Sequence, residues 1–268
     1  MLFITHQLVR RLELAETEDG LGCVVAQKRL DPAAAATSEP LAGGQLLFAG
    51  VGSPLTHALS LGFEGQVTHS DAERMEEFYS TRGSGVTVDV SPYADGSLVE
   101  TLTKRHYRLS EFTNMLVRQI HPGEQIPELP GAPPTRLATH SEAELYAGTV
   151  IRGFFGRDEV TAEELHLGRT LFAVPGTQCY VAILDDVPGA CGQVSFHAGV
   201  ATCFGDSTLV SYRRRGAHAA LIRTRLAEAA ARGCDLITAG TQPGSISQRD
   251  YERQGFQVAY TKVTMVLD

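Results

Sequence analysis

The sequence predicts an α+β fold in which a mixed sheet carries helices on both sides, and in which this arrangement occurs twice. Short apolar segments bounded by glycine and proline are typical of strands. Other segments have apolar residues at helical spacing behind Ser, Thr or Asp, as helices do. Each half of the chain runs in the order strand, helix, strand, helix, strand, strand. This repeated order indicates an internal duplication of weak sequence similarity.

The second half gives the clearer pattern. Helices are predicted from Ser141, with Glu144 in capping-box position, and from Thr161, with Glu164 three residues later. A hairpin of strands 179–184 and 191–197 across the turn 185–189, a strand at 200–210, a helix at 216–232 and a buried strand at 235–239 follow. A short helix at 245–254 and strands at 256–260 and 263–267 complete the order.

The first half is fainter. We expect a strand at 46–49, helices at 71–81 and 97–105, and strands at 86–90, 107–112 and 115–120. Residues 31–45 are rich in alanine, glycine and proline and are predicted to form an exposed loop. The proline-rich run 121–134 cannot supply a helix interior or a central strand. The sequence therefore predicts a first domain at 1–125, a linker at 126–134 and a second domain at 135–268.

Composition excludes several classes of protein. The 268 residues carry a formal charge of −8, which argues against a nucleic-acid-binding protein. No apolar run approaches the roughly 18 residues that a membrane span needs, and the first residues are too short and polar a stretch for a signal peptide. The five cysteines show no metal-ligand or Cys-x-x-Cys spacing, as expected of reduced thiols. We therefore expect a cytoplasmic protein without a metal ion.

The stretch 208–222 reads as a strand, an arginine-glycine turn and an amphipathic helix. Free N–H groups at a helix start, the positive end of the helix dipole and nearby guanidinium groups together suit a pyrophosphate. Neither the ATP-binding loop Gly-x-x-x-x-Gly-Lys-Ser/Thr nor the NAD-binding Gly-x-Gly-x-x-Gly occurs in the chain. The alternative is that the three arginines form a solvated turn.

Two motifs carry a resemblance to a known family. Arg213-Arg-Arg-Gly-Ala-His218 resembles the Gln/Arg-x-x-Gly-x-Gly/Ala cofactor motif of the GNAT acyl-CoA N-acyltransferase superfamily, and residues 247–256 resemble that family's last helix with its Tyr-x-x-x-Gly-Phe ending. The resemblance covers residues 135–268, and the first half resembles a degenerate copy, as in tandem-domain members. It implies two GNAT-like domains, each a mixed, mostly antiparallel sheet flanked by helices.

The resemblance also implies a cofactor, acetyl-CoA or another acyl-CoA, lying between the strand that ends near Val210 and the strand after Gly233. His218 departs from the motif, which has a small residue at that position, so its side chain could crowd the phosphates. The residues implied to bind the cofactor are Leu209, Val210, Arg213, Arg214, Arg215, Gly216, Ala217, His218, Ala219, Ser245, Ser247 and Tyr251.

Catalytic candidates follow from the chemistry of acyl transfer. Tyr251 stands where the family has a tyrosine near the cofactor sulfur, and a phenol could protonate a departing thiolate as general acid; the alternative is an aromatic residue that packs the helix. Asp206 and His197 are candidate bases for the amine. Asp206 could instead be an exposed turn residue beside Gly205, and His197 a structural histidine. The oxyanion donor would be a backbone N–H near Leu209 or Val210.

The first domain lacks the two motifs of the second. Residues 102–107 do not reproduce the Tyr-x-x-x-Gly-Phe ending, and the glycine-containing stretch 50–62 has no arginine. We therefore expect it to be structural. The chain as a whole is predicted to be an N-acetyltransferase that acts by direct transfer in a ternary complex, as a monomer or homodimer, on a small-molecule amine; a protein N-terminus or lysine is the less favoured acceptor. The alternative is a non-catalytic acyl-CoA-binding sensor or partner protein.

Overall fold

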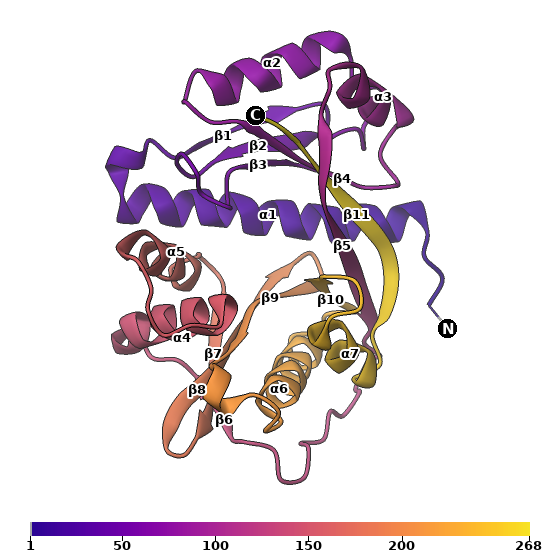
Figure 1. Cartoon of the computed structure of the whole chain (residues 1–268). Helices are drawn as coiled ribbons and strands as arrows, with labels where there is room; N and C mark the ends of the chain where they lie inside the picture. Colours follow the sequence, from indigo (N-terminus) through magenta and orange to yellow (C-terminus); the bar gives the residue numbers. More distant parts are fainter. Residues whose placement is uncertain (1) are drawn as a thin grey trace. The chain divides into compact units, whose positions relative to one another are not determined.

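Backbone contacts divide the chain into two compact units. The computed structural model describes residues 2–268, with unit 1 formed by residues 3–115 and 258–268 and unit 2 by residues 116–257 (Figure 1). The predicted linker 126–134 thus lies inside unit 2, and the end of the chain returns to unit 1 because its last strand pairs with a strand of that unit. None of the helices in the described residues is long and apolar enough to cross a membrane.

Unit 1 is a sheet with helices on both sides. Its elements are α1 (His6–Leu30), η1 (Pro32–Ala34), β1 (Thr37–Leu41), β2 (Gly44–Phe48), β3 (His57–Leu59), α2 (His69–Ser80), β4 (Val86–Val90), α3 (Gly96–Lys104), the first part of β5 (Arg108–Gln119) and nearly all of β11 (Gln257–Leu267). The strands lie in the order β1-β2-β3-β4-β11.

Alternation along β2 shows how unit 1 packs. Leu46 and Phe48 join the cluster that includes the α2 and α3 side chains, whereas Leu47 between them joins the cluster on α1. Figure 1 accordingly shows α2 and α3 on one side of the strands and α1 along the other. The predicted sheet with helices on both sides is confirmed here.

Several local predictions for unit 1 were wrong. Residues 31–45 are not a loop, since β1 forms an antiparallel hairpin with β2 across the turn Ala42-Gly43, where both residues have positive φ. Two strands were predicted at 107–120, but β5 is continuous. The sequence prediction also missed α1, a 25-residue helix, and β3, which lies within the glycine-containing stretch 50–62.

A buried cluster of charges joins α1 to β11 inside unit 1. Lys262 lies 3.3 Å from Glu13 and also contacts Glu16, and the Tyr260 hydroxyl donates to Glu13 at 2.6 Å. Burial by itself would lower the pKa of Lys262, but the surrounding carboxylates raise it well above its ordinary value. Each buried charge has a partner of opposite sign, as a stable interior requires. We assign this cluster a structural role.

Unit 2 repeats the arrangement of unit 1. It contains the end of β5, β6 (Thr135–Leu137), η2 (His140–Glu142), α4 (Ala143–Phe155), α5 (Ala162–Phe172), β7 (Gln178–Leu184), β8 (Val187–His197), β9 (Val200–Thr208), η3 (Val210–Tyr212), α6 (Ala217–Ala231), β10 (Leu236–Thr241) and α7 (Ile246–Arg253). The strands lie in the order β5-β10-β9-β8-β7-β6. In β7, Cys179 and Val181 face the α4 cluster, while Tyr180 and Ala182 face the α6 cluster.

The predictions for unit 2 hold with local corrections. Thr161 and Glu164 form the predicted capping box of α5. The box before α4 is made by Thr139 and Glu142 instead of Ser141 and Glu144, because the chain first makes a turn of 3₁₀ helix. The hairpin turn is shorter than predicted, and the two strands predicted at 256–260 and 263–267 are the single strand β11, which begins at Gln257.

Candidate functional site

The candidate site lies where β9 leaves its neighbour β10. The two strands pair in parallel only from Val200↔Leu236 to Cys203↔Ala239, although β9 continues to Thr208. Beyond Cys203, one extra residue in β9 forms a bulge against β8 at Gly205, whose φ is +63°. A bulge re-aims the neighbouring side chain and ends regular pairing. Asp206 therefore lies in the part of β9 that no longer pairs with β10.

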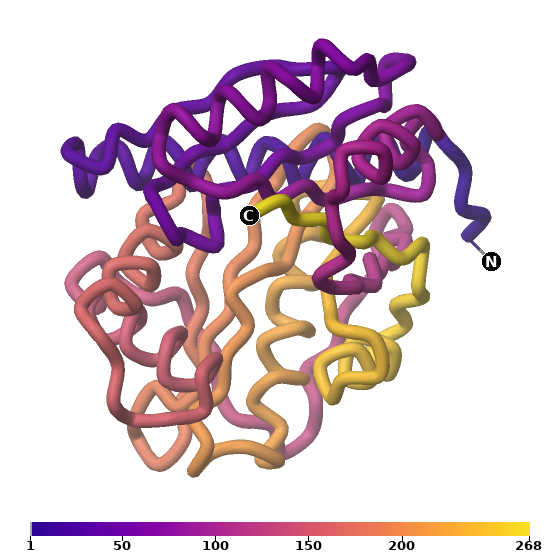
Figure 2. Tube along the Cα trace, turned by 45° about the horizontal axis from the view of Figure 1, so that its top comes forward, coloured from indigo at the N-terminus to yellow at the C-terminus, as the bar shows by residue number. Residues whose placement is uncertain are grey.

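Beyond β9, the chain turns into α6, as the orange part of the trace in Figure 2 shows. The N–H groups of residues 214–219 have no hydrogen-bond partner among the described residues. Gly216 caps the helix in the left-handed conformation, with φ of +82°, and supplies no side chain to the cap. The first turn of α6 contains no acidic residue. These donors and the positive end of the helix can therefore accept an anion.

The three arginines of this turn have different surroundings. Arg213 donates to the Gly153 carbonyl in α4 at 2.8 Å, and Arg215 makes a bidentate pair with Asp185 at 2.7 Å. Arg214 is exposed, with φ of +62°, and contacts no partner within residues 2–268. Arg213 and Arg215 therefore hold the turn in place, and Arg214 is the guanidinium that is available to a ligand.

The corresponding helix of unit 1 begins differently. Thr68 caps α2 through a full capping box with Asp71, which places a carboxylate in the first turn. The capping box occupies the N–H groups of Thr68 and Asp71, and the Asp71 carboxylate neutralises the positive end of the helix. The start of α2 is thus unsuited to a phosphate, which agrees with the expectation that only the second half of the chain binds a cofactor.

Asp206 is the centre of a buried network that joins β9, α6 and α7. Its carboxylate accepts a hydrogen bond from the Tyr251 hydroxyl and lies 2.5 Å from Nη2 of Arg225. Tyr251 is 1% exposed and Arg225 is 0% exposed. Arg225 also donates to the carbonyls of Gln193 and Leu221, at 3.0 Å each. The network satisfies charges that would otherwise be costly to bury.

This network bears on the two catalytic candidates Asp206 and Tyr251. Asp206 is not an exposed turn residue, since its side chain is 16% exposed. Burial would raise the pKa of Asp206, but the charges of Arg225 and His218 hold it well below its ordinary range, so Asp206 is a weak base at neutral pH. Burial and the Asp206 carboxylate raise the pKa of Tyr251 well above its ordinary value, and its proton points to Asp206.

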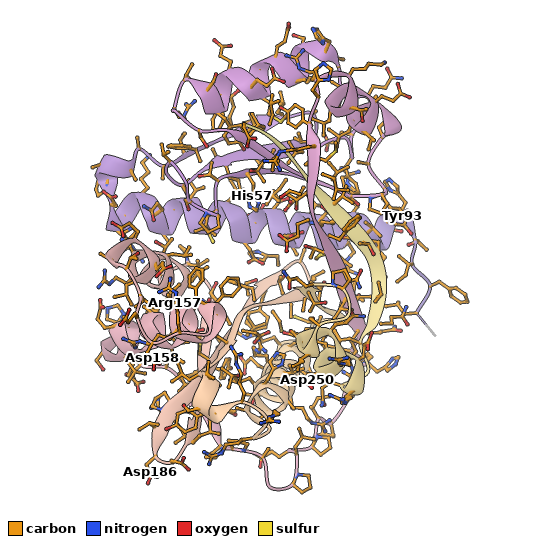
Figure 3. All side chains as sticks on the ribbon, viewed as in Figure 1. His57, Tyr93, Arg157, Asp158, Asp186 and Asp250 are labelled. Atoms are coloured by element: carbon orange, nitrogen blue, oxygen red, sulfur yellow. The ribbon has the colours of Figure 1, made fainter. Side chains whose placement is uncertain are left out.

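The His218 ring lies between two carboxylates, those of Asp206 and Asp250. Its Nδ1 lies 3.2 Å from Asp250 Oδ2, its Nε2 lies 3.5 Å from Asp206 Oδ2, and the ring makes a T-shaped contact with the ring of Tyr251. Figure 3 labels Asp250 on α7. The side chain of His218 is thus held by the two carboxylates. Although burial favours the neutral ring, Asp206 and Asp250 raise the pKa of His218 to about 9.

Stability should accordingly fall with rising pH. The pKa of His218 is raised from 6.5 to about 9 on folding, so protonation stabilises the fold fully below pH 6.5 and this contribution is lost as pH rises through 9. At about 1.4 kcal/mol per pKa unit, the loss is about 3 kcal/mol. Urea unfolding between pH 6.5 and 9.5 measures it. His218→Asn should flatten the curve, and an equal slope in the variant would contradict the assignment.

Of the remaining residues predicted to bind the cofactor, some already have hydrogen-bond partners in the protein and others do not. Leu209 already donates its N–H to the Gly189 carbonyl at 3.0 Å, which leaves the N–H of Val210 as the unoccupied donor there. Ser245 caps α7 by accepting from the N–H of Gln248, whereas the half-buried Ser247 has no partner in the described part of the chain.

His197 is the candidate that lies elsewhere. It pairs with Val200 at the first residue of β9, six positions before Asp206, which is roughly 20 Å along a strand. His197 and Asp206 therefore cannot serve one reaction centre together. The residues 2–268 contain no group of three or more His, Cys, Asp or Glu side chains that could hold a metal ion.

Sequence reasoning missed Arg225 and Asp250. Arg225 had one local signal, because it interrupts the apolar face of α6 between Ile222 and Leu226, where a charge needs a buried partner. Asp250 had none, since it looks like any charged residue on a short surface helix. The two contacts join residues far apart in the sequence and could be found only from the fold.

Comparisons with known proteins bear on the fold. No protein-family model matches the sequence, and no curated protein matches it. A GCN5-related N-acetyltransferase from Kribbella flavida is similar in structure, with a TM-score of 0.63 and 18% identity over 92% of this chain and 95% of that protein. A tandem GNAT protein from the clavulanic acid biosynthesis pathway is similar as well, with a TM-score of 0.61 and 14% identity over 92% of this chain and 87% of that protein.

The chain has the tandem GNAT fold. A third GNAT structure, a GCN5-related N-acetyltransferase from Sphaerobacter thermophilus, gives a TM-score of 0.56 and 17% identity over 73% of this chain and 66% of that protein. The resemblance inferred from the two motifs is thereby confirmed for the fold. Since the similarities cover most of the chain, both units belong to the GNAT arrangement.

Proposed function

We propose that unit 2 binds an acyl-CoA and transfers its acyl group, acetyl in the simplest case, to a primary amine by direct transfer in a ternary complex. One observation carries the proposal: among the described residues, the six consecutive N–H groups of residues 214–219 have no partner, at an acid-free helix start beside Arg214, which has none either. This is the arrangement that a pyrophosphate needs. The GNAT fold supports it, because its structural neighbours include proteins described as N-acetyltransferases.

The turn before α6 and Ser247 suit an acyl-CoA as they stand, whereas Tyr251 must first give up a hydrogen bond. The turn from Arg213 to Ala219 would hold the pyrophosphate, and Ser247 could contact the part of the cofactor nearer the acyl group. When bound, the cofactor supplies a thioester, whose acyl carbon an amine can attack. Tyr251 would act as general acid after its hydroxyl turns from Asp206. That turn breaks a charge-assisted hydrogen bond, at a cost of about 1.5–3 kcal/mol.

A second candidate function rests on the Asp206 network. Tyr251 is fully buried with its proton committed to Asp206, and Asp206 is itself too well paired to serve as base. These features favour a protein that binds acyl-CoA without turnover, as a sensor or partner of another enzyme. Thiol release from acetyl-CoA over a broad panel of amines separates the two functions. An acyltransferase releases thiol with at least one amine, and a non-catalytic binder releases none with any.

Arg214→Ala should weaken acetyl-CoA binding by about tenfold, because it removes the available guanidinium from the phosphates. Isothermal titration calorimetry measures the effect, which should shrink as salt is raised. Arg108→Ala is a matched control, since Arg108 is an exposed arginine of unit 1 and lies outside the turn. Equal affinities for Arg214→Ala and the wild type would contradict a role for this arginine.

A further inference from the structure

The His218 ring belongs to a cluster of charges drawn from three elements of unit 2. Asp206 comes from β9, Arg225 from α6 and Asp250 from α7, and the ring lies 3.5 Å from the first carboxylate and 3.2 Å from the second. The side chains of His218, Asp206 and Asp250 are 17%, 16% and 21% exposed. Solvent therefore screens their charges only weakly.

The charges of the four side chains His218, Asp206, Asp250 and Arg225 balance only when the ring is protonated. The two carboxylates of Asp206 and Asp250 carry −2, and Arg225 carries +1, so the imidazolium supplies the missing positive charge. Tyr251 on α7 donates a neutral hydroxyl to Asp206, and the exposed Arg253 on α7 pairs with the outer side of Asp250 at 2.7 Å. Tyr146 on α4, Cys191 on β8 and Cys203 on β9 also face the cluster, and burial raises the pKa of Tyr146 and of Cys191 well above its ordinary value. Loss of the His218 proton thus leaves one excess negative charge in the half-buried core of the cluster.

The same residue also belongs to the phosphate-binding turn. His218 is the second residue of α6, and its free N–H is one of the six donors of residues 214–219. Nε2 of its ring has no hydrogen-bond partner among the described residues, so Asp206 holds the ring by charge alone. We propose that His218 makes the binding of a nucleotide pyrophosphate at the start of α6 depend on the proton of its imidazole ring. This inference rests on the proposed acyl-CoA site and adds its regulation by protons.

The direction of the effect follows from the charges. Asp206 and Asp250 raise the pKa of His218 to about 9, so the ring is cationic at neutral pH and the four side chains of the cluster are neutral overall. As pH rises through 9, these four side chains become negative overall beside the N–H donors in the first turn of α6. The repulsion between this one negative charge and a bound pyrophosphate lowers the affinity of the site by about tenfold. By linkage, bound pyrophosphate raises the pKa of the ring in turn.

Calorimetric titration with 3′-phosphoadenosine 5′-diphosphate, from pH 7 to pH 10, tests the proposal. This probe carries the pyrophosphate of CoA and has no thiol that titrates in the same range. The wild type should bind with constant affinity up to about pH 8 and lose about tenfold by pH 10. His218→Asn should bind at pH 7 as weakly as the wild type does at pH 10, with no change between. His140→Asn, at an exposed histidine outside the site, should keep the wild-type profile.

Two further measurements keep the test decisive if His218→Asn folds poorly. Asp250→Asn removes one partner of the ring, so the fall in affinity should move to lower pH. Nuclear magnetic resonance of the His218 ring should show titration near pH 9 in the free protein and at higher pH with the probe bound. Binding without pH dependence, or a ring that titrates near its ordinary 6.5, would overturn this inference alone. Absence of binding at every pH would overturn the proposed function as well.

Discussion

Asp206→Asn should destabilise the protein by about 3–5 kcal/mol, because it leaves the guanidinium of Arg225 buried without its counter-charge. Asparagine has nearly the same shape, so little of this loss comes from packing. The change also removes the carboxylate from His218 and from the Tyr251 hydroxyl. Urea unfolding at pH 7, followed by circular dichroism, measures the difference in the free energy of unfolding.

Two variants separate the buried pair from a general effect of charge removal. Asp250→Asn removes a carboxylate that is less buried and should cost about 1 kcal/mol or less. Asp206→Asn combined with Arg225→Met removes both charges of the pair, so it should be less destabilising than the sum of the single changes. A loss below about 1 kcal/mol for Asp206→Asn, or strictly additive losses in the double variant, would count against a buried ion pair at this place.

Tyr251→Phe should lower turnover by about 100-fold or more while it changes the affinity for acetyl-CoA by less than about threefold. The phenyl ring keeps its packing against Phe256 and His218, while the hydroxyl is lost with its hydrogen bonds to Asp206 and from Arg225. Steady-state thiol release gives the turnover number, and calorimetry gives the affinity. The two values together show whether the hydroxyl acts in the reaction or in binding.

Tyr146→Phe is the matched control for this change. Tyr146 is also fully buried in unit 2, but its hydroxyl has no hydrogen-bond partner in the described residues, so its removal should alter neither quantity. Equal losses of turnover and affinity in Tyr251→Phe would show that the hydroxyl holds the site together and does not donate a proton. Turnover that matches the wild type would remove Tyr251 from the mechanism.

The order of elements could be read from the sequence where local signals are strong. The capping box of Thr161 and Glu164 and the alternation in β4 are encoded within a few residues and were predicted at nearly the observed positions. The helix α1 was missed because its buried positions include Glu13, Thr17 and Asp19, which blur the apolar face. Their burial depends on partners such as Lys262 that lie far away in the sequence.

The candidate site divides in the same way. The turn from Arg213 to Gly216 is a local motif, so its free N–H groups could be anticipated from the strand, the glycine and the helix that follows. The Asp206 network could not, because the bulge at Gly205 breaks the alternation of β9 and resembles an exposed turn in the sequence. The buried charge of Asp206 becomes intelligible only when α6 brings Arg225 beside it.

Titration of the purified protein with acetyl-CoA, followed by calorimetry, tests the central claim most directly. The account predicts one binding site per chain with a dissociation constant of about 1–100 μM. Affinity should fall when Arg214 is replaced and when salt is raised, since the pyrophosphate is held by the free N–H groups of α6 and by this arginine. Absence of binding at millimolar acetyl-CoA would contradict the claim that unit 2 is an acyl-CoA site.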